Sequence, residues 1–332
     1  MLTLCIKTHK IVNGRTGGKR MKKVFIDGAA GTTGLKVLER LSERKDIELI
    51  TLSEENRKDL SARKDALNNC DIAFLCLPDD AAREAVSLVD NPDTVIIDTS
   101  TAHRTADGWA YGFPELKGQR EKIASAKRIA NPGCHATGVI SLIKPLIDNG
   151  LLSGVEKISC FSTTGYSGGG KKMIADYEAP ENKTAFSAPR LYGLGQTHKH
   201  LPEIKKVCSL KNEPVFCPVV APFYSGMQVI IPLTADDINI GVDGIKKIYA
   251  DYYKDGLVKF ADKMDENGFL SAASLSGFDN MRVGVYGNDD RFTLISLFDN
   301  LGKGASGAAI QNMNISLGID ETTGLVISED ML

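Results

Sequence analysis

The sequence predicts an α/β protein in which a doubly wound parallel sheet is joined to a second domain of the α+β class. Three observations support this prediction. A strand, a glycine-rich turn and a helix follow one another between residues 22 and 41. Apolar strands then alternate with helices up to about residue 130, as in a parallel sheet covered on both faces. Beyond residue 150 polar and apolar residues alternate along the strands, which is typical of a mixed or antiparallel sheet.

Length and composition are those of an ordinary soluble globular protein. The chain has 332 residues, enough for two domains, of which 42% are hydrophobic and 25% charged. A net charge of -2 gives no sign of a nucleic acid or membrane surface as partner, and no apolar run is long enough to span a bilayer. Seven cysteines without framework spacing favour a reducing, cytoplasmic location over a secreted one.

The first 20 residues read as a separate segment. They contain no acidic residue and lack both the apolar core of a signal peptide and the serines of a transit peptide. A strand pattern begins directly after Met21. We therefore expect Met21 to be the functional start and residues 1–20 to be a disordered extension.

The glycine-rich turn has the character of a nucleotide-binding loop. Its glycines, Gly28, Gly31 and Gly34, lie between the strand 22–27 and the helix that follows. Gly28 permits a tight turn, Gly31 lets a phosphate approach the backbone, and Gly34 lets the helix pack closely on the strand. The sequence therefore predicts a Rossmann-type dinucleotide site. We assign to the cofactor, besides the three glycines, the loop residues Ala30, Thr32 and Thr33.

Further strands at 47–52, 71–77 and 94–98, with a helix at 81–89, complete the predicted parallel sheet. The segment after the last of these strands lies at a carboxyl end, where such sheets bind ligands. Ser100 and Arg104 belong to it, and Arg104 is a candidate for holding an anionic substrate group, the alternative being a surface ion pair.

The second half predicts strands at 155–162, 215–220, 228–232, 282–286 and 291–298, with a helix at 236–254 and a flexible glycine loop at 163–172. The small residues from Gly302 to Ala308 predict a helix that packs closely against backbone or cofactor, and we assign Gly304 and Ser306 to the cofactor site. We place the domains at 21–133 with 302–332 for the dinucleotide, and at 134–301 for the catalytic and dimerisation unit.

Cys134 is the candidate nucleophile. An Asn-Pro-Gly turn precedes it, and apolar residues at helical spacing from Ala136 to Ile147 predict a helix that starts at the cysteine. Free N–H groups and the positive end of the helix dipole favour thiolate there, which is the nucleophilic form. The alternative is a small buried apolar residue.

His198 and His200 lie two residues apart, and imidazole acts as acid and base near neutral pH. The sequence does not decide which of the two is the acid–base group. A zinc site is the alternative for these residues, but the spacings match no standard zinc pattern, so we predict no metal. We interpret His103 and His135 as hydrogen-bonded structural residues. The residues considered for zinc are Cys134, His135, His198, His200, Cys208 and Cys217.

Together these motifs resemble the N-acetyl-γ-glutamyl-phosphate reductase family, in its shorter-chain branch. The resemblance runs from Met21 to about Gly318, and departs at His135, where a tyrosine is more usual, and at the N-terminal extension. The motifs that carry it are Gly28-x-x-Gly31-x-x-Gly34, Asn131-Pro132-Gly133-Cys134, His198-Lys199-His200-Leu201-Pro202-Glu203 and Gly302-Lys303-Gly304-Ala305-Ser306-Gly307-Ala308.

The resemblance implies reduction of N-acetyl-glutamyl 5-phosphate by NADPH to N-acetyl-glutamate 5-semialdehyde and phosphate, in arginine biosynthesis. Cys134 would form a thioester with the acyl group, and backbone N–H groups at the helix start would hold the oxyanion. One of His198 and His200 would be the acid–base partner. The candidates for binding the substrate phosphate or α-carboxylate are Ser100, Arg104, Ser167 and Arg190. We also expect a homo-oligomer, either a dimer or a tetramer.

The cofactor is predicted to be NADP (NADPH). In sheets of this kind an acidic residue at the end of the second strand holds the ribose 2′-hydroxyl of NAD. Here Ser53 stands at that point, and the basic residues Arg57 and Lys58 follow, of which Arg57 has the two-pronged group better suited to a 2′-phosphate. Glu54 and Glu55 oppose this assignment, since a small shift of the strand boundary would bring one of them to the ribose.

Three alternatives remain open at this point. An aspartate-semialdehyde dehydrogenase uses the same combination of cysteine, histidine and dinucleotide domain, although the H-x-H-x-P-E segment argues against it. A regulatory protein that senses nucleotides could keep the fold and lose the chemistry, although Cys134 and the paired histidines argue against that. A lysine-type, carrier-linked substrate could replace the free N-acetyl amino acid.

Overall fold

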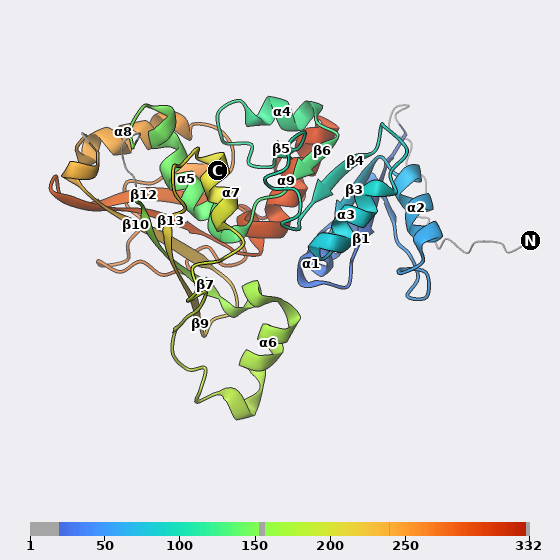
Figure 1. Ribbon diagram of the computed structural model, residues 1–332, viewed down its shortest axis with the longest axis horizontal. Helices are drawn as coiled ribbons and strands as arrows, with labels where there is room; N and C mark the ends of the chain where they lie inside the picture. The colour runs from blue at the N-terminus through green and yellow to red at the C-terminus, as the bar shows by residue number, and fades with distance from the viewer. Residues whose placement is uncertain (1–19, 153–156, 239, 330–332) are drawn as a thin grey trace, which may run out of the picture.

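The computed structural model describes residues 20–152, 157–238 and 240–329, which form two sheets flanked by helices (Figure 1). Nearly all of the predicted N-terminal extension, 1–20, lies outside the described residues, and so do residues 155 and 156 at the start of one predicted strand.

The first sheet is doubly wound and parallel, as predicted. Its six strands run in the order β2-β1-β3-β4-β6-β5, and every pairing is parallel. The chain winds outward from β1 in one direction to β2 and in the other to β3, so a topological switch point lies between β1 and β3, where such sheets bind ligands. The strands are β1 Lys22–Asp27, β2 Ile47–Ile50, β3 Ile72–Leu75, β4 Val95–Asp98, β5 Ala110–Tyr111 and β6 Arg128–Ala130.

Helices bury both faces of this sheet, which explains why its central strands read as continuous apolar runs. On one face Val24 and Phe74 pack with α1, α4 and α9, and on the other Phe25 and Leu75 pack with α2 and α3. Helix α9 follows the second sheet in the chain but returns to the first (Figure 1). The helices are α1 Thr32–Ser42, α2 Leu60–Asn69, α3 Asp79–Ser87, α4 Gln119–Ser125 and α9 Gly307–Leu317.

The second sheet is mixed and mostly antiparallel, again as predicted, with seven strands in the order β11-β12-β13-β10-β7-β9-β8. Only β11 with β12 and β7 with β9 run parallel. Helices α5, α7 and α8 share a buried cluster with one face of this sheet. The strands are β7 Ser159–Gly165, β8 Arg190–Leu191, β9 Val215–Ala221, β10 Met227–Thr234, β11 Val258–Phe260, β12 Met281–Gly287 and β13 Arg291–Phe298; the helices are α5 Cys134–Asp148, α7 Leu201–Val207 and α8 Val242–Tyr252.

The prediction of a flexible loop over residues 163–172 is wrong. Strand β7 continues to Gly165, a 3₁₀ turn η1 spans Tyr166–Gly169, and α6 begins at Gly170 and runs to Glu178. Gly170 has φ of +75°, a conformation that favours glycine, so these glycines build a defined turn. Helix α6 buries no residue and extends away from both sheets (Figure 1).

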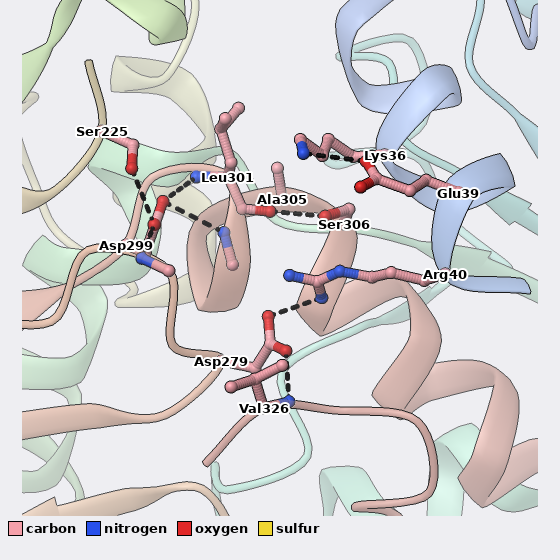
Figure 2. Close-up of polar contacts among 12 residues, drawn as sticks. Lys36, Glu39, Arg40, Ser225, Asp279, Asp299, Leu301, Ala305, Ser306 and Val326 are labelled. Atoms are coloured by element: carbon pink, nitrogen blue, oxygen red, sulfur yellow. Dashed lines mark hydrogen bonds and ion pairs between the residues drawn. The ribbon is translucent and has the colours of Figure 1, made fainter. Parts of the chain in front are cut away.

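The two sheets are joined by polar contacts around the segment that returns from β13 to α9. Arg40 of α1 donates to Oδ1 of Asp279 at 2.6 Å, and Oδ2 of Asp279 accepts the N–H of Val326 at 2.8 Å (Figure 2). The Asp299 carboxylate accepts the N–H of Leu301 at 2.7 Å and the hydroxyl of Ser225 at 2.9 Å. The Arg40–Asp279 contact therefore fixes the first helix of one sheet against a loop of the other, and the Asp299 contacts hold the return segment in place.

A π-helical turn, η4, spans Gly302–Ser306 before α9 begins, so the predicted helix of small residues is present with a wider first turn. Lys303 of η4 is buried, and its Nζ lies 2.8 Å from both carboxylate oxygens of Glu115. The same Glu115 accepts the N–H of Leu257 at 2.9 Å. One buried ion pair therefore connects the first sheet's loops, the return segment and the second sheet's loops.

Candidate active site

A cavity of about 470 Å³ lies between the carboxyl end of the first sheet and the second domain. It is lined by the glycine loop, the turn after β4, the cysteine turn, the histidine segment, the start of α6 and the turn η4. Of the residues proposed from sequence, it brings together Gly31, Thr32, Thr33, Ser100, Arg104, Cys134, Ser167, His198, His200 and Gly304. The other proposed residues, which do not line it, are Gly28, Ala30, Gly34, Ser53, Arg57, Arg190 and Ser306.

The glycine loop is closely packed at its two ends and open in the middle. Gly28 has φ of +87°, and a Cβ there would lie 2.3 Å from the carbonyl oxygen of Cys76. A Cβ on Gly34 would lie 2.4 Å from the carbonyl oxygen of Gly28, whereas a Cβ on Gly31 would meet no protein atom closer than 3.6 Å. The outer glycines therefore serve the turn and helix packing, and Gly31 leaves room for a ligand.

The start of α1 keeps unused hydrogen-bonding groups. No side chain caps the helix, and within the described residues the buried Oγ1 of Thr32 has no hydrogen-bond partner. Exposed N–H groups at a helix N-terminus attract phosphate. These residues fit the diphosphate of a dinucleotide.

The turn after β2 lies outside the cavity. The strand ends at Ile50, before the predicted end at Leu52, and the carbonyl of Ser53 accepts the N–H groups of Asn56 and Arg57 at 3.1 and 2.9 Å. The guanidinium of Arg57 is half exposed and lies 3.3 Å from Glu54. Arg57 is therefore paired at the surface in this structure.

Cys134 is the first residue of α5, with Gly133 as the N-cap, so the predicted helix start is confirmed. The turn before it is held on two sides: Nε of Arg104 donates to the carbonyl of Asn131 at 2.9 Å, and Glu203 accepts the N–H of Gly133 at 2.9 Å. A Cβ on Gly133 would lie 2.4 Å from Nη1 of Arg104 and from Nε2 of His200, so only glycine fits there.

The expectation of a resting thiolate is wrong. Burial raises the pKa of the Cys134 thiol to about 11, while the charge of Arg104 and the backbone N–H of His135 act in the opposite direction. Desolvation of the charged form outweighs the helix start because the sulfur lies in the interior of the cavity wall. The cysteine is a thiol at neutral pH, and its attack on a substrate requires a base.

The two histidines of the H-x-H segment differ in exposure. His200 is buried at the N-cap of α7; burial, followed by the Arg104 charge, holds its pKa well below the usual range, and its Nδ1 has no partner among the described residues. His198 is partly exposed, and burial, followed by the charges of Lys199 and Arg104, lowers its pKa to about 4. Its Nδ1 accepts the N–H of His200 at 3.2 Å. Both imidazoles are neutral at pH 7.

His135 has the structural role expected from the sequence. Its Nδ1 lies 2.7 Å from Oγ of Ser162 and its Nε2 lies 2.6 Å from the hydroxyl of Tyr192, and burial lowers its pKa to about 3. Tyr192 itself lines the cavity, and nothing in its local sequence distinguished it from other tyrosines. His103 also has a partner, since its Nδ1 lies 2.6 Å from Asp98.

Of the residues expected to bind substrate anions, Ser100, Arg104 and Ser167 line the cavity and make contacts within the protein, whereas Arg190 does not line it. Arg104 donates through all three nitrogens, to Asn131, Glu203 and the carbonyl of Thr99. Ser100 donates to Asp98 at 2.8 Å, and Ser167 accepts from Asn300 at 3.0 Å. Arg190 lies on the exposed edge strand β8, with its guanidinium 4.1 Å from the centre of the Phe186 ring. Ser306 is buried and donates to the carbonyl of Leu301 at 2.6 Å.

Sequence reasoning missed two residues of the H-x-H-x-P-E segment. Lys199 lines the cavity with an exposed side chain and places a positive charge near Asp79 and Cys134. Glu203 is buried and bonded to the cysteine turn. Their position in the motif beside the histidines was the available signal, but neither was given a role.

No helix in the described part of the chain is long and apolar enough to cross a membrane. Residues 20–152, 157–238 and 240–329 contain no group of three or more histidine, cysteine or acidic side chains placed to hold a metal ion.

Comparisons with known proteins agree with this arrangement. The sequence profile of the semialdehyde dehydrogenase NAD binding domain matches residues 23–126, and that of the semialdehyde dehydrogenase dimerisation domain matches residues 134–300. An N-acetyl-gamma-glutamyl-phosphate reductase 2 of a Nostoc species is 46% identical over 319 residues, 91% of this chain and 99% of its own. An N-acetyl-gamma-glutamyl-phosphate reductase of Sinorhizobium medicae is 45% identical over 305 residues, 89% of this chain and 98% of its own.

The fold is also found in solved structures. Aspartate semialdehyde dehydrogenase II of Vibrio cholerae matches with a TM-score of 0.68 over 90% of this chain and 99% of its own, at 17% identity. The aspartate semialdehyde dehydrogenase of Francisella tularensis matches with a TM-score of 0.67 over 89% and 99%, at 18% identity. A Rossmann-like parallel sheet joined to a mixed-sheet domain is therefore a shared architecture.

Proposed function

Because the chain belongs to the N-acetyl-γ-glutamyl-phosphate reductase family, we propose that it reduces N-acetyl-glutamyl 5-phosphate to N-acetyl-glutamate 5-semialdehyde and phosphate, a step of arginine biosynthesis. The observation that carries the proposal is the position of Cys134 at the start of α5, in one cavity with the glycine loop and the paired histidines. The cytoplasm is the proposed site of the reaction, in keeping with the free cysteines in the described part of the chain.

The proposed cofactor is NADP. Gly31, Thr32 and Thr33 would hold its diphosphate at the start of α1, and the turn at Ser53 and Arg57 would face its 2′-phosphate once Arg57 leaves Glu54. NADPH, when bound, supplies the hydride that reduces the acyl group. The proposed unit for it is residues 21–133 with 302–332, and the catalytic unit is 134–301.

His198 is proposed as the acid–base residue because it is the more exposed of two neutral imidazoles that line the cavity. His198 takes the thiol proton as the sulfur of Cys134 bonds to the acyl carbon and the bond to phosphate breaks. The proton passes to the departing phosphate, and a thioester remains on Cys134.

Backbone N–H groups at the start of α5 stabilise the oxyanion that forms when the thioester is reduced. His198 then supplies a proton from solvent to that oxygen. The C–S bond breaks, the aldehyde is released, and the proton returns through His198 to the sulfur, which restores the thiol. His200, packed against Gly133, keeps the turn in place during these steps.

Lys199 is proposed to bind a substrate anion, either the phosphate or the α-carboxylate. It is exposed on the cavity wall between the two histidines, whereas the guanidinium of Arg104 is bonded on all three nitrogens. An ammonium group suits this role as a point charge with three donors. Ser100 and Ser167 shape the same wall through their bonds to Asp98 and Asn300.

The match of the dimerisation domain to residues 134–300 supports a homo-oligomer, and we propose a dimer. Phe161 of β7 pairs in register with Cys217 and Ile230, so the three side chains lie on one face of the second sheet. The side chain of Phe161 is 46% exposed, and α5, α7 and α8 cover the opposite face. A second copy would bury this row, and Phe161→Arg should yield monomers in size-exclusion chromatography.

The experiment that tests the proposed function is the reverse reaction. The purified protein is supplied with NADP, phosphate and either N-acetyl-glutamate semialdehyde or aspartate semialdehyde. We expect NADPH formation with the first aldehyde only. Formation with aspartate semialdehyde alone would identify the rival dehydrogenase, and formation with neither would favour a sensing protein. An assay with a carrier-linked, lysine-type semialdehyde distinguishes that substrate class.

A further inference from the structure

Glu203 does not line the cavity itself, but it lies at the centre of a buried hydrogen-bond network that reaches the cavity wall at Arg104 and Gly133. Its exposed fraction is 1%. Its Oε1 accepts the hydroxyl of Tyr111 at 2.7 Å and the N–H of Gly133 at 2.9 Å, and its Oε2 accepts from Nη1 of Arg104 at 3.2 Å. One carboxylate therefore binds three parts of the fold, namely strand β5, the turn after β4 and the cysteine turn.

This carboxylate also connects the histidines to the nucleophile. Glu203 lies in the first turn of α7, three residues after His200, which caps that helix. Nε2 of His200 and Nη1 of Arg104 both approach Gly133 so closely that a Cβ would lie 2.4 Å from each. The hydrogen bond from Gly133 to Glu203 therefore sets the position of the H-x-H segment relative to Cys134.

The network also determines the charge around the sulfur. The positive groups near Cys134 are Arg104 from the turn after β4 and Lys199 from the segment before α7, and Glu203 is the negative one. The other titratable groups of the cluster, His135, His198, His200 and Tyr192, are neutral at pH 7. Lys303 of the neighbouring turn η4 is paired with Glu115. Glu203 is thus the one described carboxylate that offsets Arg104 beside the thiol.

We propose that Glu203 is a positioning residue for the nucleophile, which holds the Cys134 turn against the histidine segment and offsets the charge of Arg104 beside the sulfur. The part that concerns turnover rests on the proposed function. The part that concerns the thiol does not, because alkylation of Cys134 needs no substrate. A thiol that stays protonated until a base and substrate are present is protected from oxidation and from adventitious alkylation.

Two substitutions of Glu203 test the effect of its negative charge and the effect of its side-chain length separately. Glu203→Gln keeps an oxygen for the N–H of Gly133 and removes the charge, so Arg104 is no longer offset. The pKa of Cys134 should then fall, which makes iodoacetamide labelling of Cys134 between pH 7.5 and 9 about tenfold faster. Glu203→Asp keeps the charge but is one methylene shorter, so labelling should stay close to the parental rate while kcat falls about tenfold or more and KM changes little.

Labelling is followed at Cys134 by peptide mass spectrometry, and thermal unfolding is recorded for each variant. Asp279→Asn is the matched control, since Asp279 is also a buried carboxylate bonded to one arginine and one backbone N–H (Figure 2). It should lower the unfolding temperature without changing the labelling rate.

If Glu203→Gln does not fold, Tyr111→Phe replaces it. Loss of the Tyr111 hydroxyl leaves more negative charge on Oε1, so labelling should become about twofold slower.

Parental labelling rates in Glu203→Gln, or equal acceleration in Asp279→Asn, would overturn the proposal. So would an unchanged rate in Tyr111→Phe where that variant serves as the test, or an unchanged kcat in Glu203→Asp. Failure of the proposed function has a different signature, because the parent itself would then lack reductase activity while the labelling rates still differed among the variants.

Discussion

The two walls of the cavity differ in the groups that they present to a ligand. The wall from the first sheet offers backbone: Gly31 leaves open space, and the start of α1 keeps free N–H groups. The wall from the second domain offers side chains, and each reactive one is fixed by a contact from a distant segment, as Glu203 fixes the Cys134 turn. A backbone site tolerates most side-chain changes, whereas a side-chain site depends on the identity of each group.

The largest expected effect short of losing the nucleophile comes from the second wall. His198→Asn should lower kcat by roughly 10²–10⁴-fold, because it removes the proposed acid–base group and keeps a polar side chain of similar size. His200→Asn should act on stability and KM more than on kcat, since His200 packs against Gly133. Steady-state kinetics of both variants check this. A larger loss of kcat in His200→Asn would reverse the assigned roles.

The first wall should be sensitive to a Cβ added at the glycines of its loop. Gly31→Ala has room for its Cβ, so the unfolding temperature should stay near that of the parent, while KM for NADPH rises roughly 10–100-fold through loss of a phosphate contact. Gly34→Ala is the matched contrast, because its Cβ would lie 2.4 Å from the carbonyl oxygen of Gly28 and the fold itself should be destabilised. Equal unfolding temperatures in the two variants would contradict the distinction.

Features of the two walls that depend on neighbouring residues could be predicted from the sequence, whereas features that depend on distant segments could not. The turn at Gly28 and the helix start at Cys134 depend on neighbouring residues, so local pattern located both. The thiol of Cys134 was misjudged because its desolvation comes from segments far along the chain. The ion pair of Arg104 is buried rather than on the surface, and its partner Glu203 could not be identified from sequence because it is 99 residues away. Arg190 does not line the cavity because it lies on the edge strand β8. No local pattern indicates that a strand lies at the edge of a sheet.

Lowering the pH should destabilise the second wall of the cavity, which contains the buried histidines, before it destabilises the first. His135, His198 and His200 have pKa values lowered by burial below the value of 6.5 expected in the unfolded chain. Their contribution to stability is present above pH 6.5 and is lost as the pH falls toward the folded-state values. Each costs up to about 1.4 kcal/mol per pH unit in that window, about tenfold in the folding equilibrium constant.

Urea denaturation between pH 7.5 and 5 measures this loss, and His135→Gln is the variant that isolates one contribution, because His135 is hydrogen-bonded rather than catalytic. Its stability should depend less steeply on pH than that of the parent. A stability that is flat from pH 7.5 to 5 in the parent would mean that the histidines are not buried in neutral form.

The smallest effect should come from Arg57, at the surface of the first wall. Arg57→Ala should lower the ratio of kcat/KM for NADPH to that for NADH by several-fold, because Arg57 is half exposed and shared with Glu54. Glu54→Ala should change the ratio in the opposite direction by freeing Arg57. Preference for NADH in the parent would overturn the choice of cofactor, and an unchanged ratio in Arg57→Ala would move the phosphate contact to Ser53 or Lys58.

The most direct test of the thioester on Cys134 is a single-turnover measurement without phosphate. The protein is mixed with NADP and N-acetyl-glutamate semialdehyde, NADPH absorbance is followed, and the quenched protein is analysed by mass spectrometry. We expect a burst of one NADPH per active site, an N-acetyl-glutamyl group on Cys134, and steady turnover on addition of phosphate. Cys134→Ser should show neither burst nor adduct. A burst that survives in Cys134→Ser, or an adduct on any other residue, would contradict the account.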